Sequence, residues 1–168
     1  QLLAYVDNGF GLFVASGGSP APTSSFVRYQ GAAATGTITI AAGNPSNGDT
    51  VTLTDYLGTV QVFVFVTGAA PQTSVVGIPV TIGVDNTTTG VNLRDAINGA
   101  RNYLKIAATA ASGVVTVTQR NVGTPGNTTI TKSGANITVS GFTGGQTPGD
   151  WSITIAAGSP QFDPARFD

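Results

Sequence analysis

Side chains able to do acid–base or nucleophilic chemistry are few in this chain and poorly matched. The 168 residues include no His, Cys, Met or Glu, so all eight acidic residues are Asp. The lack of His removes the commonest general base and metal ligand, and the lack of Cys removes thiol nucleophiles, thiolate zinc sites and disulfides. Ser16, Ser24 and Ser112 lie in Gly- or Ser-rich surroundings, but the only lysines, Lys105 and Lys132, provide none of them with an activating base. The sequence therefore predicts a protein that is not an enzyme.

Two carboxylates enclose one predicted strand. Asp49 and Asp55 flank residues 50–54, and together with loop carbonyl groups they offer the oxygen ligands that a hard cation prefers. Their spacing does not match an EF-hand, and Asp is frequent in turns because its side chain caps backbone N–H groups. Capping is the favoured interpretation for both residues, and equally for Asp85 and Asp95 near the predicted helix. No carboxylate pair stands out as the acid and base of a glycosidase, so we predict no metal and no cofactor.

Aromatic and basic side chains offer two further binding chemistries. Aromatic rings can stack on sugars, although packing in a core or an interface is the favoured interpretation for Tyr5, Tyr29, Tyr56, Tyr103 and Trp151. Four of the five arginines are too dispersed to line a nucleic-acid groove, namely Arg28, Arg94, Arg101 and Arg120. Net charge is −1, only 9% of residues are charged, and no apolar run approaches the roughly 20 residues of a membrane span. We expect neither nucleic acid nor membrane as a partner, and a surface poorly protected against self-association.

One helix is predicted, over Val91–Leu104. Its apolar residues recur at helical spacing and form a core-facing stripe, namely Leu93, Ala96, Ile97, Ala100 and Leu104. Asn92 is the expected N-cap, with Asp95 three residues later as a capping-box partner. Gly99 costs roughly 1 kcal/mol relative to Ala, so packing on a sheet must hold this helix in place.

Short alternating segments predict strands in most of the remaining chain. They are Leu2–Val6, Phe10–Val14, Phe26–Gln30 (a short strand or an anchor), Gly36–Ala41, Thr50–Thr54, Val60–Val66, Ile78–Val84, Lys105–Ala108, Val114–Thr118, Thr128–Thr131, Ile137–Ser140 and Asp150–Ala156. Val60–Val66 has valines on one face and two Phe on the other, which predicts a central strand covered on both sides. Pro79 places its strand at a sheet edge or a strand start. The predicted fold class is α+β, mostly β, with one short helix on antiparallel sheets.

Three segments are predicted along the chain. Residues 1–35 form an N-terminal arm with a Gly/Pro/Ser linker at 17–25, residues 36–145 a β-rich core module, and residues 146–168 a C-terminal strand and extended tail. ITIAAG occurs at 38–43 and again at 153–158, which fits either chance or a duplicated strand. The chain begins with Gln1 and not Met, so we expect processing or a longer parent chain.

The terminal segments are too apolar for free solvated tails. Asp7-Asn8-Gly9 predicts a hairpin turn between the first two strands. An isolated two-stranded hairpin is marginal in water, so we predict that both ends contact other subunits. The predicted interface residues are Leu2, Leu3, Tyr5, Val6, Phe10, Leu12, Phe13, Val14, Trp151, Phe162 and Phe167.

The order of motifs in the middle of the chain matches a known pattern. TGTITIAAGNPSNGDTVTL, VQVFVFV, VNLRDAING and GVVTVTQRNVGTPGN follow one another over about Gly36–Gly141. In this order they resemble a Gly- and Thr-rich β domain of structural proteins in tailed-bacteriophage virions. The resemblance implies a capsid decoration, tail or fibre protein, carries over no catalytic residues, and leaves residues 1–35 and 146–168 uncovered.

The residues and the resemblance together predict a non-enzymatic structural component of a phage particle. A capsid decoration (cement) protein is the first interpretation, and a tail, baseplate or fibre component is the second. Two alternatives of other classes remain open: a carbohydrate-binding or adhesin module, and a surface-filament subunit. The expected partners are further copies of the chain, as a homo-oligomer, and the major capsid or tail proteins, so the expected location is the extracellular virion.

Overall fold

The chain forms two compact units. A computed structural model describes the backbone of residues 2–7, 10–15, 24–28, 30–68, 77–149 and 151–155, and the side chains of residues 30–68 and 77–149. The terminal unit combines both ends of the chain, Gln1–Tyr29 and Asp150–Asp168, and the central module is Gln30–Gly149. The chain therefore passes into the central module once and returns once to the terminal unit.

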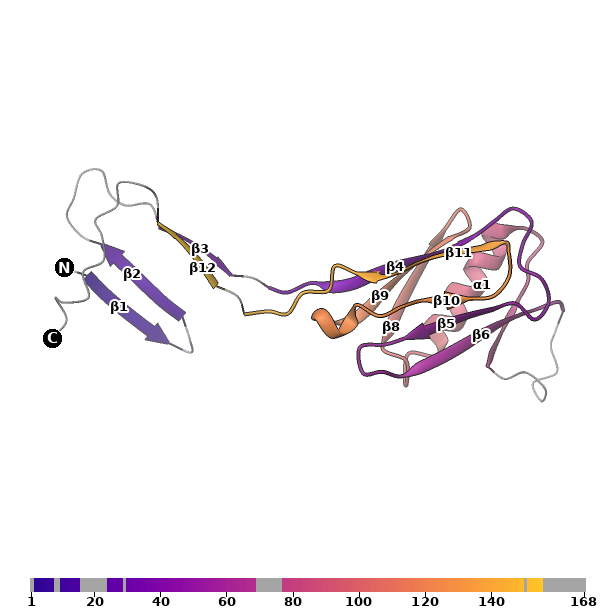
Figure 1. Cartoon of the computed structure of the whole chain (residues 1–168), viewed down its shortest axis with the longest axis horizontal. Helices are drawn as coiled ribbons and strands as arrows, with labels where there is room; N and C mark the ends of the chain where they lie inside the picture. Colours follow the sequence, from indigo (N-terminus) through magenta and orange to yellow (C-terminus); the bar gives the residue numbers. More distant parts are fainter. Residues whose placement is uncertain are drawn as a thin grey trace. The chain divides into compact units, whose positions relative to one another are not determined.

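Two four-stranded sheets make up the central module (Figure 1). Its elements are β4 (Ala33–Ile40), β5 (Thr50–Thr54), β6 (Val60–Val66), β7 (Ile78–Thr81), α1 (Asn86–Gly99), β8 (Ile106–Ala111), β9 (Val114–Val122), the 3-10 turn η1 (Thr124–Gly126), β10 (Thr131–Lys132) and β11 (Ile137–Thr143). Sheet I has the order β10-β5-β6-β7, and sheet II has the order β11-β4-β9-β8. All neighbours are antiparallel except β6 and β7, which are parallel. This arrangement confirms the predicted α+β, mostly β, class.

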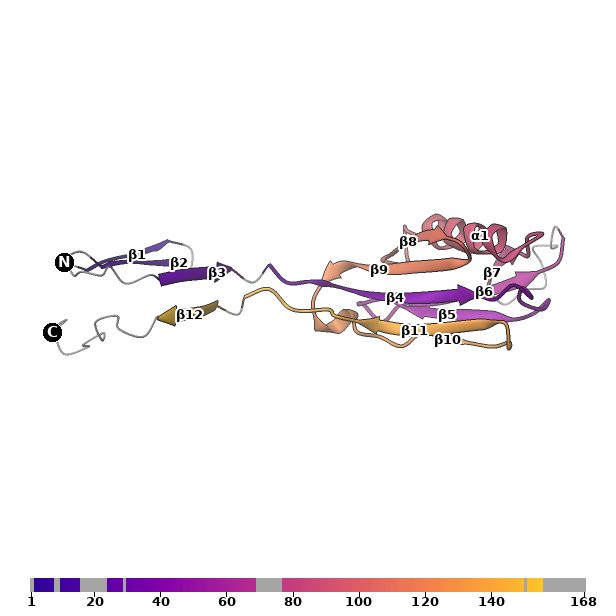
Figure 2. The same ribbon diagram turned by 90° about the horizontal axis from the view of Figure 1, so that it is seen from above.

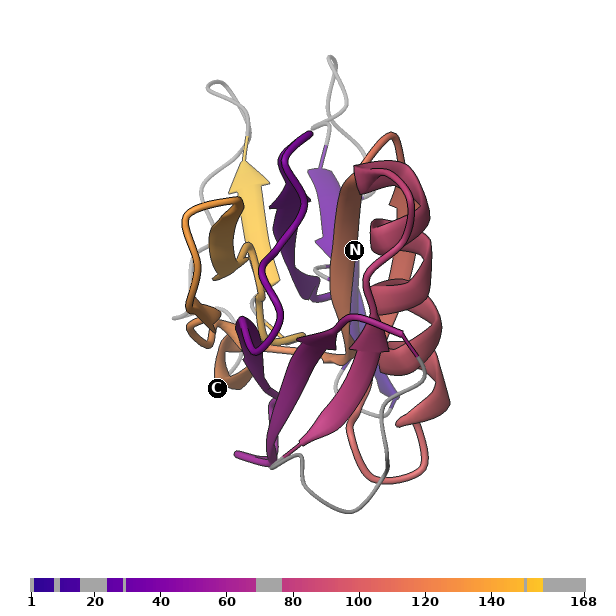
Figure 3. The same cartoon turned by 90° about the vertical axis from the view of Figure 1, so that its right-hand side faces the viewer.

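Alternation along the strands builds the core between the two sheets. In β4 every second residue is buried, ending in Ile38 and Ile40, while the residues between them face outward. β6 places Phe63 and Phe65 in the same core. The helix α1 lies along one side of both sheets, beside β8 (Figures 2 and 3). It contributes Leu93 and Ile97.

The predicted bounds of the helix were wrong by five residues at each end. α1 spans Asn86–Gly99, and its N-cap is Asp85, whose Oδ1 accepts a 2.7 Å hydrogen bond from the Thr88 N–H. Asn92, the predicted N-cap, lies inside the helix. The prediction relied on apolar residues, and these are missing from the first helical turn, which is polar. There the buried Thr89 hydroxyl donates a hydrogen bond to the Asp85 carbonyl.

The predicted apolar stripe nevertheless lies at the core. Leu93 and Ile97 are buried within α1, and Ala96 is partly buried against the core. Ala100 is the C-cap, and Leu104 follows in the turn that leads to β8. Both are buried. The chain thus leaves helical geometry while still placing side chains in the core.

Several strands also differ from their predicted extent. β9 continues to Val122, well beyond the predicted end at Thr118, and β10 covers only Thr131–Lys132. β7 is an edge strand of sheet I, as Pro79 predicted. β6 is central in its sheet, and over Phe63–Val66 both of its faces are buried, as predicted. The valine face is open only toward the start of the strand, where Val60 is 59% exposed.

The terminal unit contains two antiparallel strand pairs. β1 (Leu2–Asp7) and β2 (Phe10–Ala15) form the predicted hairpin across residues 8 and 9. β3 (Ser24–Arg28) pairs with β12 (Trp151–Ile155) from the other end of the chain. Two expectations were therefore wrong: the linker ends before Ser24, and the two ends are not separate extended arms. The predicted tail after residue 155, with Phe162 and Phe167, lies outside the described residues.

A two-residue bridge marks the point where the chain enters and leaves the central module. The Ala32 N–H donates to the Gln146 carbonyl, the Gln146 N–H donates to the Ala32 carbonyl, and both distances are 2.9 Å. The first and last segments of the module therefore run side by side as an antiparallel pair. From this pair the chain continues into β4 on one side and comes from β11 on the other.

Candidate functional site

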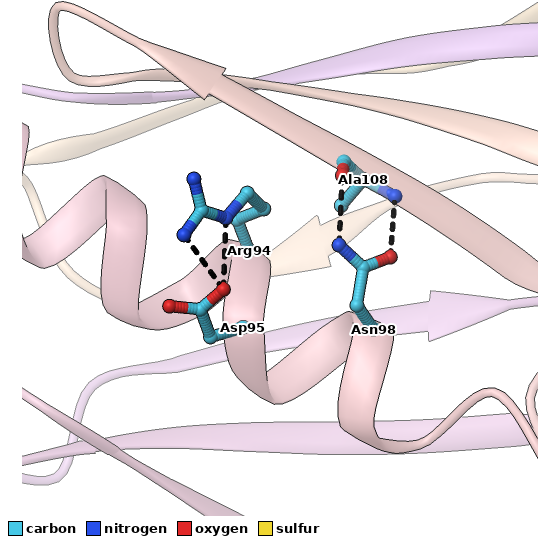
Figure 4. Close-up of polar contacts among 4 residues, drawn as sticks. All are labelled: Arg94, Asp95, Asn98 and Ala108. Atoms are coloured by element: carbon cyan, nitrogen blue, oxygen red, sulfur yellow. Dashed lines mark hydrogen bonds and ion pairs between the residues drawn. The ribbon is translucent and has the colours of Figure 1, made fainter.

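The helix α1 covers the free edge of sheet II with a side-chain amide. Asn98 Nδ2 donates to the Ala108 carbonyl at 2.8 Å, and the Ala108 N–H donates to Asn98 Oδ1 at 3.0 Å (Figure 4). A neighbouring strand would make the same two kinds of hydrogen bond to this residue of β8. Asn98 thus occupies an edge position at which another chain would otherwise add a strand.

A second asparagine of α1 covers the nearby edge of sheet I. Asn92 Nδ2 donates to the Thr81 carbonyl, at the end of β7, over 2.8 Å. The buried side chains of Leu93 and Ile97 fill the space between the sheets on the same side. A single helix therefore closes the module between β7 and β8.

The opposite side of the module is closed by the segment that links the two sheets. β10 lies against β11, so the other edge strands of sheet I and sheet II contact each other. The Phe142 N–H donates to the Thr128 carbonyl at 2.9 Å, and the Thr50 N–H donates to Ser133 Oγ at 2.8 Å. Every edge strand in residues 30–68 and 77–149 therefore contacts another element of the module.

Three of the four acidic residues of the module act as caps, which confirms the favoured interpretation for Asp49, Asp55 and Asp85. The fully buried Asp55 accepts three backbone N–H groups: Oδ1 accepts from Leu57 and Thr59, Oδ2 accepts from Lys105, and each distance is 2.9 Å. Asp49 Oδ2 accepts from the Ser46 N–H at 2.8 Å. Among the described residues, no three acidic, His or Cys side chains gather as metal ligands would.

Asp95 and the hydroxyl candidates have other surroundings. The capping interpretation was wrong for Asp95, which lies inside α1 and forms an exposed ion pair with Arg94, with 2.7 Å between Oδ1 and Nη2 (Figure 4). Ser112 lies exposed in the turn between β8 and β9. The two lysines donate to carbonyl groups, Lys105 to Asn102 and Lys132 to Gly134. Within the described side chains this arrangement offers no nucleophile–base pair.

A buried amide that the sequence analysis missed links the two sheets. Gln119 in β9 is 1% exposed, its Oε1 accepts the Tyr56 N–H at 3.0 Å, and its Nε2 donates to the Thr54 carbonyl at 3.0 Å and to Thr128 Oγ1 at 3.3 Å. The signal was present in the alternation, because Gln119 continues the inward series of Val115 and Val117. A polar residue at a core position indicates a buried side chain that forms hydrogen bonds to several neighbouring groups.

The predicted sugar-stacking residues do not form a described site. Tyr56 is partly buried and Tyr103 is half-exposed after α1. The side chains of Tyr5, Tyr29 and Trp151 lie outside the described ones, so the stacking interpretation is not supported by any geometry in the module.

The predicted interface residues belong to the terminal unit, where each described strand has a single partner strand. Four of them lie in β1, four in β2 and Trp151 in β12. The register sets Leu3 opposite Val14 and Tyr5 opposite Leu12. Among the described residues, β1, β2, β3 and β12 thus each leave one edge without a strand. This is the opposite of the central module, whose edges are covered.

No family model matches this chain, and no curated protein or solved structure gives a significant match. No helix among the described residues is long and apolar enough to cross a membrane. The structure defines two units: a two-sheet α+β module, and a second unit that is built from both ends of the chain.

Proposed function

We propose that this protein is a non-enzymatic structural subunit of a bacteriophage virion, and in the first place a capsid decoration protein. The observation that carries the proposal is the contrast in strand edges. The central module covers its edges with α1 and with the β10–β11 contact, whereas each described strand of the terminal unit pairs on one side only. Assembly through the terminal unit follows from that contrast.

The physical basis is strand addition to a marginal structure. A two-stranded sheet has little stability of its own in water, and the backbone groups at its free edge accept a further strand. β1 and β2 are rich in Leu, Val and Phe, so a partner surface that covers them gains about 25 cal/mol for each Å² of apolar area buried. Neighbouring subunits of the virion supply that surface.

A tail, baseplate or fibre component is the second candidate, because the same terminal strands serve an assembly of few copies. The number of copies distinguishes the two candidates. Quantitative mass spectrometry of purified virions gives hundreds of copies for a decoration protein, and few for a fibre or baseplate component. Virions without this chain, or a purified chain that binds glycans as a monomer, would favour the adhesin alternative.

The decisive experiment compares the full chain with residues 30–149. The shorter chain keeps the complete core and its covered edges, so we expect it to unfold cooperatively and to sediment as a monomer. The full chain is expected to form oligomers and to bind virions. If residues 30–149 assemble as well as the full chain does, the terminal unit does not carry assembly and the proposal fails.

We also propose that the chain has no hydrolytic or transfer activity. The proposal rests on the missing His, Cys and Glu and on the use of buried Asp55 to cap backbone N–H groups. Turnover of a polysaccharide or peptide by the purified chain, abolished by a single Asp→Asn substitution, would contradict it.

A further inference from the structure

The outward face of sheet II is a regular array of hydroxyl groups. The strand registers align its outward residues in three rows across the four strands. The rows are Thr138–Thr39–Val114–Ala111, Ser140–Thr37–Thr116–Thr109 and Thr143–Thr35–Thr118–Ala107. Nine of these twelve positions carry a hydroxyl group and none carries a charge. We call this surface the hydroxyl face.

The hydroxyl face is open in the single chain. Eight of its twelve residues, including Thr39, Thr109 and Thr116, are exposed and the other four are partly exposed. The helix α1 does not cover it, because α1 packs on the other side of sheet II: buried Gly90 lies against Gly113 and the inward-facing Val115. The face is therefore available to a partner.

The face carries no charge in a chain that is itself poor in charge, since only 9% of its residues are charged. The module does carry charged side chains outside the buried Asp55, but they lie on α1, in turns, at β10 or at the far end of β9. They are Arg94, Asp95, Arg101, Lys105, Asp49, Asp85, Lys132 and Arg120. A charged partner would find no complementary group on the hydroxyl face.

We propose that the hydroxyl face docks the same face of a second copy of this chain within the assembly. This inference rests on the proposed structural function. A Thr hydroxyl both donates and accepts hydrogen bonds, so two identical faces can satisfy each other without charges. Such a contact is isologous, with one patch serving both copies. The Thr methyl groups and Val114 supply the apolar part of the contact.

The size of the face explains why the contact needs the terminal unit. Four strands about 4.8 Å apart and roughly 17 Å of strand length give a face of about 300 Å². Two such faces bury about 600 Å² in total, below the roughly 1,200 Å² of a stable interface. The contact therefore forms only between copies that the terminal unit already holds together, at an effective concentration in the mM range. Residues 30–149 alone remain monomeric.

Cysteine cross-linking of the full chain tests this contact directly, because the sequence contains no Cys. Thr116 lies in the middle row, so Thr116→Cys places a single thiol near the centre of the face. The matched control is Thr87→Cys, on the exposed side of α1. With a short bismaleimide, we expect the Thr116→Cys oligomer to form covalent dimers at least about tenfold faster than the control.

A charge substitution gives a second measurement. Thr37→Lys sets like charges against each other across the contact, and we expect it to raise the dissociation constant of the full-chain oligomer about tenfold. The control Thr131→Lys lies on sheet I and should leave that constant unchanged. Thermal melts of both variants should match the parent chain.

The outcomes separate the two proposals. A full chain that stays monomeric would overturn both the assembly function and this contact. An oligomer in which Thr116→Cys cross-links no faster than Thr87→Cys would overturn the contact alone. The same holds if virion-bound Thr116→Cys links to a different protein.

Discussion

The two units of this chain treat their strand edges in opposite ways. In the central module, side chains and neighbouring elements satisfy the edge groups, as Asn98 does for Ala108. In the terminal unit, β1 pairs with β2 and β3 with β12, and no described strand has two partners. A covered edge favours a soluble, independent fold, and an open edge favours association. This contrast is the basis of our proposal that the central module provides stability and the terminal unit provides assembly. Substitutions in each unit test the proposal.

The largest effect on the module is expected from Ile97→Asp. Ile97 is fully buried between the sheets, and a carboxylate there costs more than about 4 kcal/mol because it has no partner. Arg94→Ala, on the exposed part of the same helix, should cost about 0.5 kcal/mol or less. Chemical denaturation measures both. Equal stability of the two variants would show that α1 does not hold the core together.

Asp55→Ala should have the next largest effect. It deprives three backbone N–H groups of their acceptor in a buried site, at a cost of about 3 kcal/mol. Asp49→Ala removes a single hydrogen bond in an exposed turn, so we expect a loss below about 1 kcal/mol. A small loss for Asp55→Ala in denaturant titrations would mean that water replaces the carboxylate.

Asn98→Ala tests the covered edge of β8. The substitution leaves the Ala108 N–H and carbonyl without their partner, and we expect a loss of about 1–2 kcal/mol. It should also make residues 30–149 prone to associate, because the edge becomes available. Asn102→Ala, in the exposed turn after α1, is the control. If light scattering shows both variants equally monomeric, Asn98 contributes stability but does not protect the edge.

Asp85 gives the module a smaller, pH-dependent contribution. The hydrogen bonds from the Thr88 N–H and hydroxyl hold the pKa of Asp85 below its usual value of 3.8. Because the folded pKa is the lower one, the stabilisation is complete above the unfolded pKa of about 4 and is lost as pH falls through the folded value. Melting curves between pH 5 and 3 should bring the parent chain closer to Asp85→Asn. A constant difference would contradict this assignment.

Leu12→Asp in the terminal unit should have the smallest effect on the module. We expect the stability of the central module to change by less than about 0.5 kcal/mol, since Leu12 lies outside the central module. Sedimentation of the same variant should nevertheless show the oligomer lost. Thr87→Asp, on α1, provides a charge control that should still assemble. A variant that assembles normally would remove β2 from the interface.

The sequence predicted the parts of this structure that depend on local alternation. Thr50–Thr54 and the central position of Val60–Val66 follow from residues two apart sharing a face. The helix begins and ends earlier than predicted. Its start depends on Asp85 and on the buried Thr89 hydroxyl, and neither residue belongs to the periodic pattern of apolar residues. A pattern of apolar residues locates the buried face of a helix and not its ends.

Features that join distant segments were not predictable in this way. The pairing of β3 with β12 connects the two ends of the chain, and no local pattern encodes it. Asn98 lies on a polar side of the predicted helix. From the sequence, a residue there that faces solvent cannot be distinguished from one that hydrogen-bonds to the edge of a strand. The rows of the hydroxyl face also depend on register between strands and are visible only once that register is known.

The bridge between Ala32 and Gln146 has a mechanical consequence. Because both connections leave the module side by side, a force that draws them apart acts on one hydrogen-bonded pair at a time, first at this bridge and then at Thr35 and Thr143. A force that pulls both connections in the same direction, along β4 and β11, loads many interstrand hydrogen bonds at once, because β4 is also paired with β9. The module is therefore weak against unzipping and strong under axial tension.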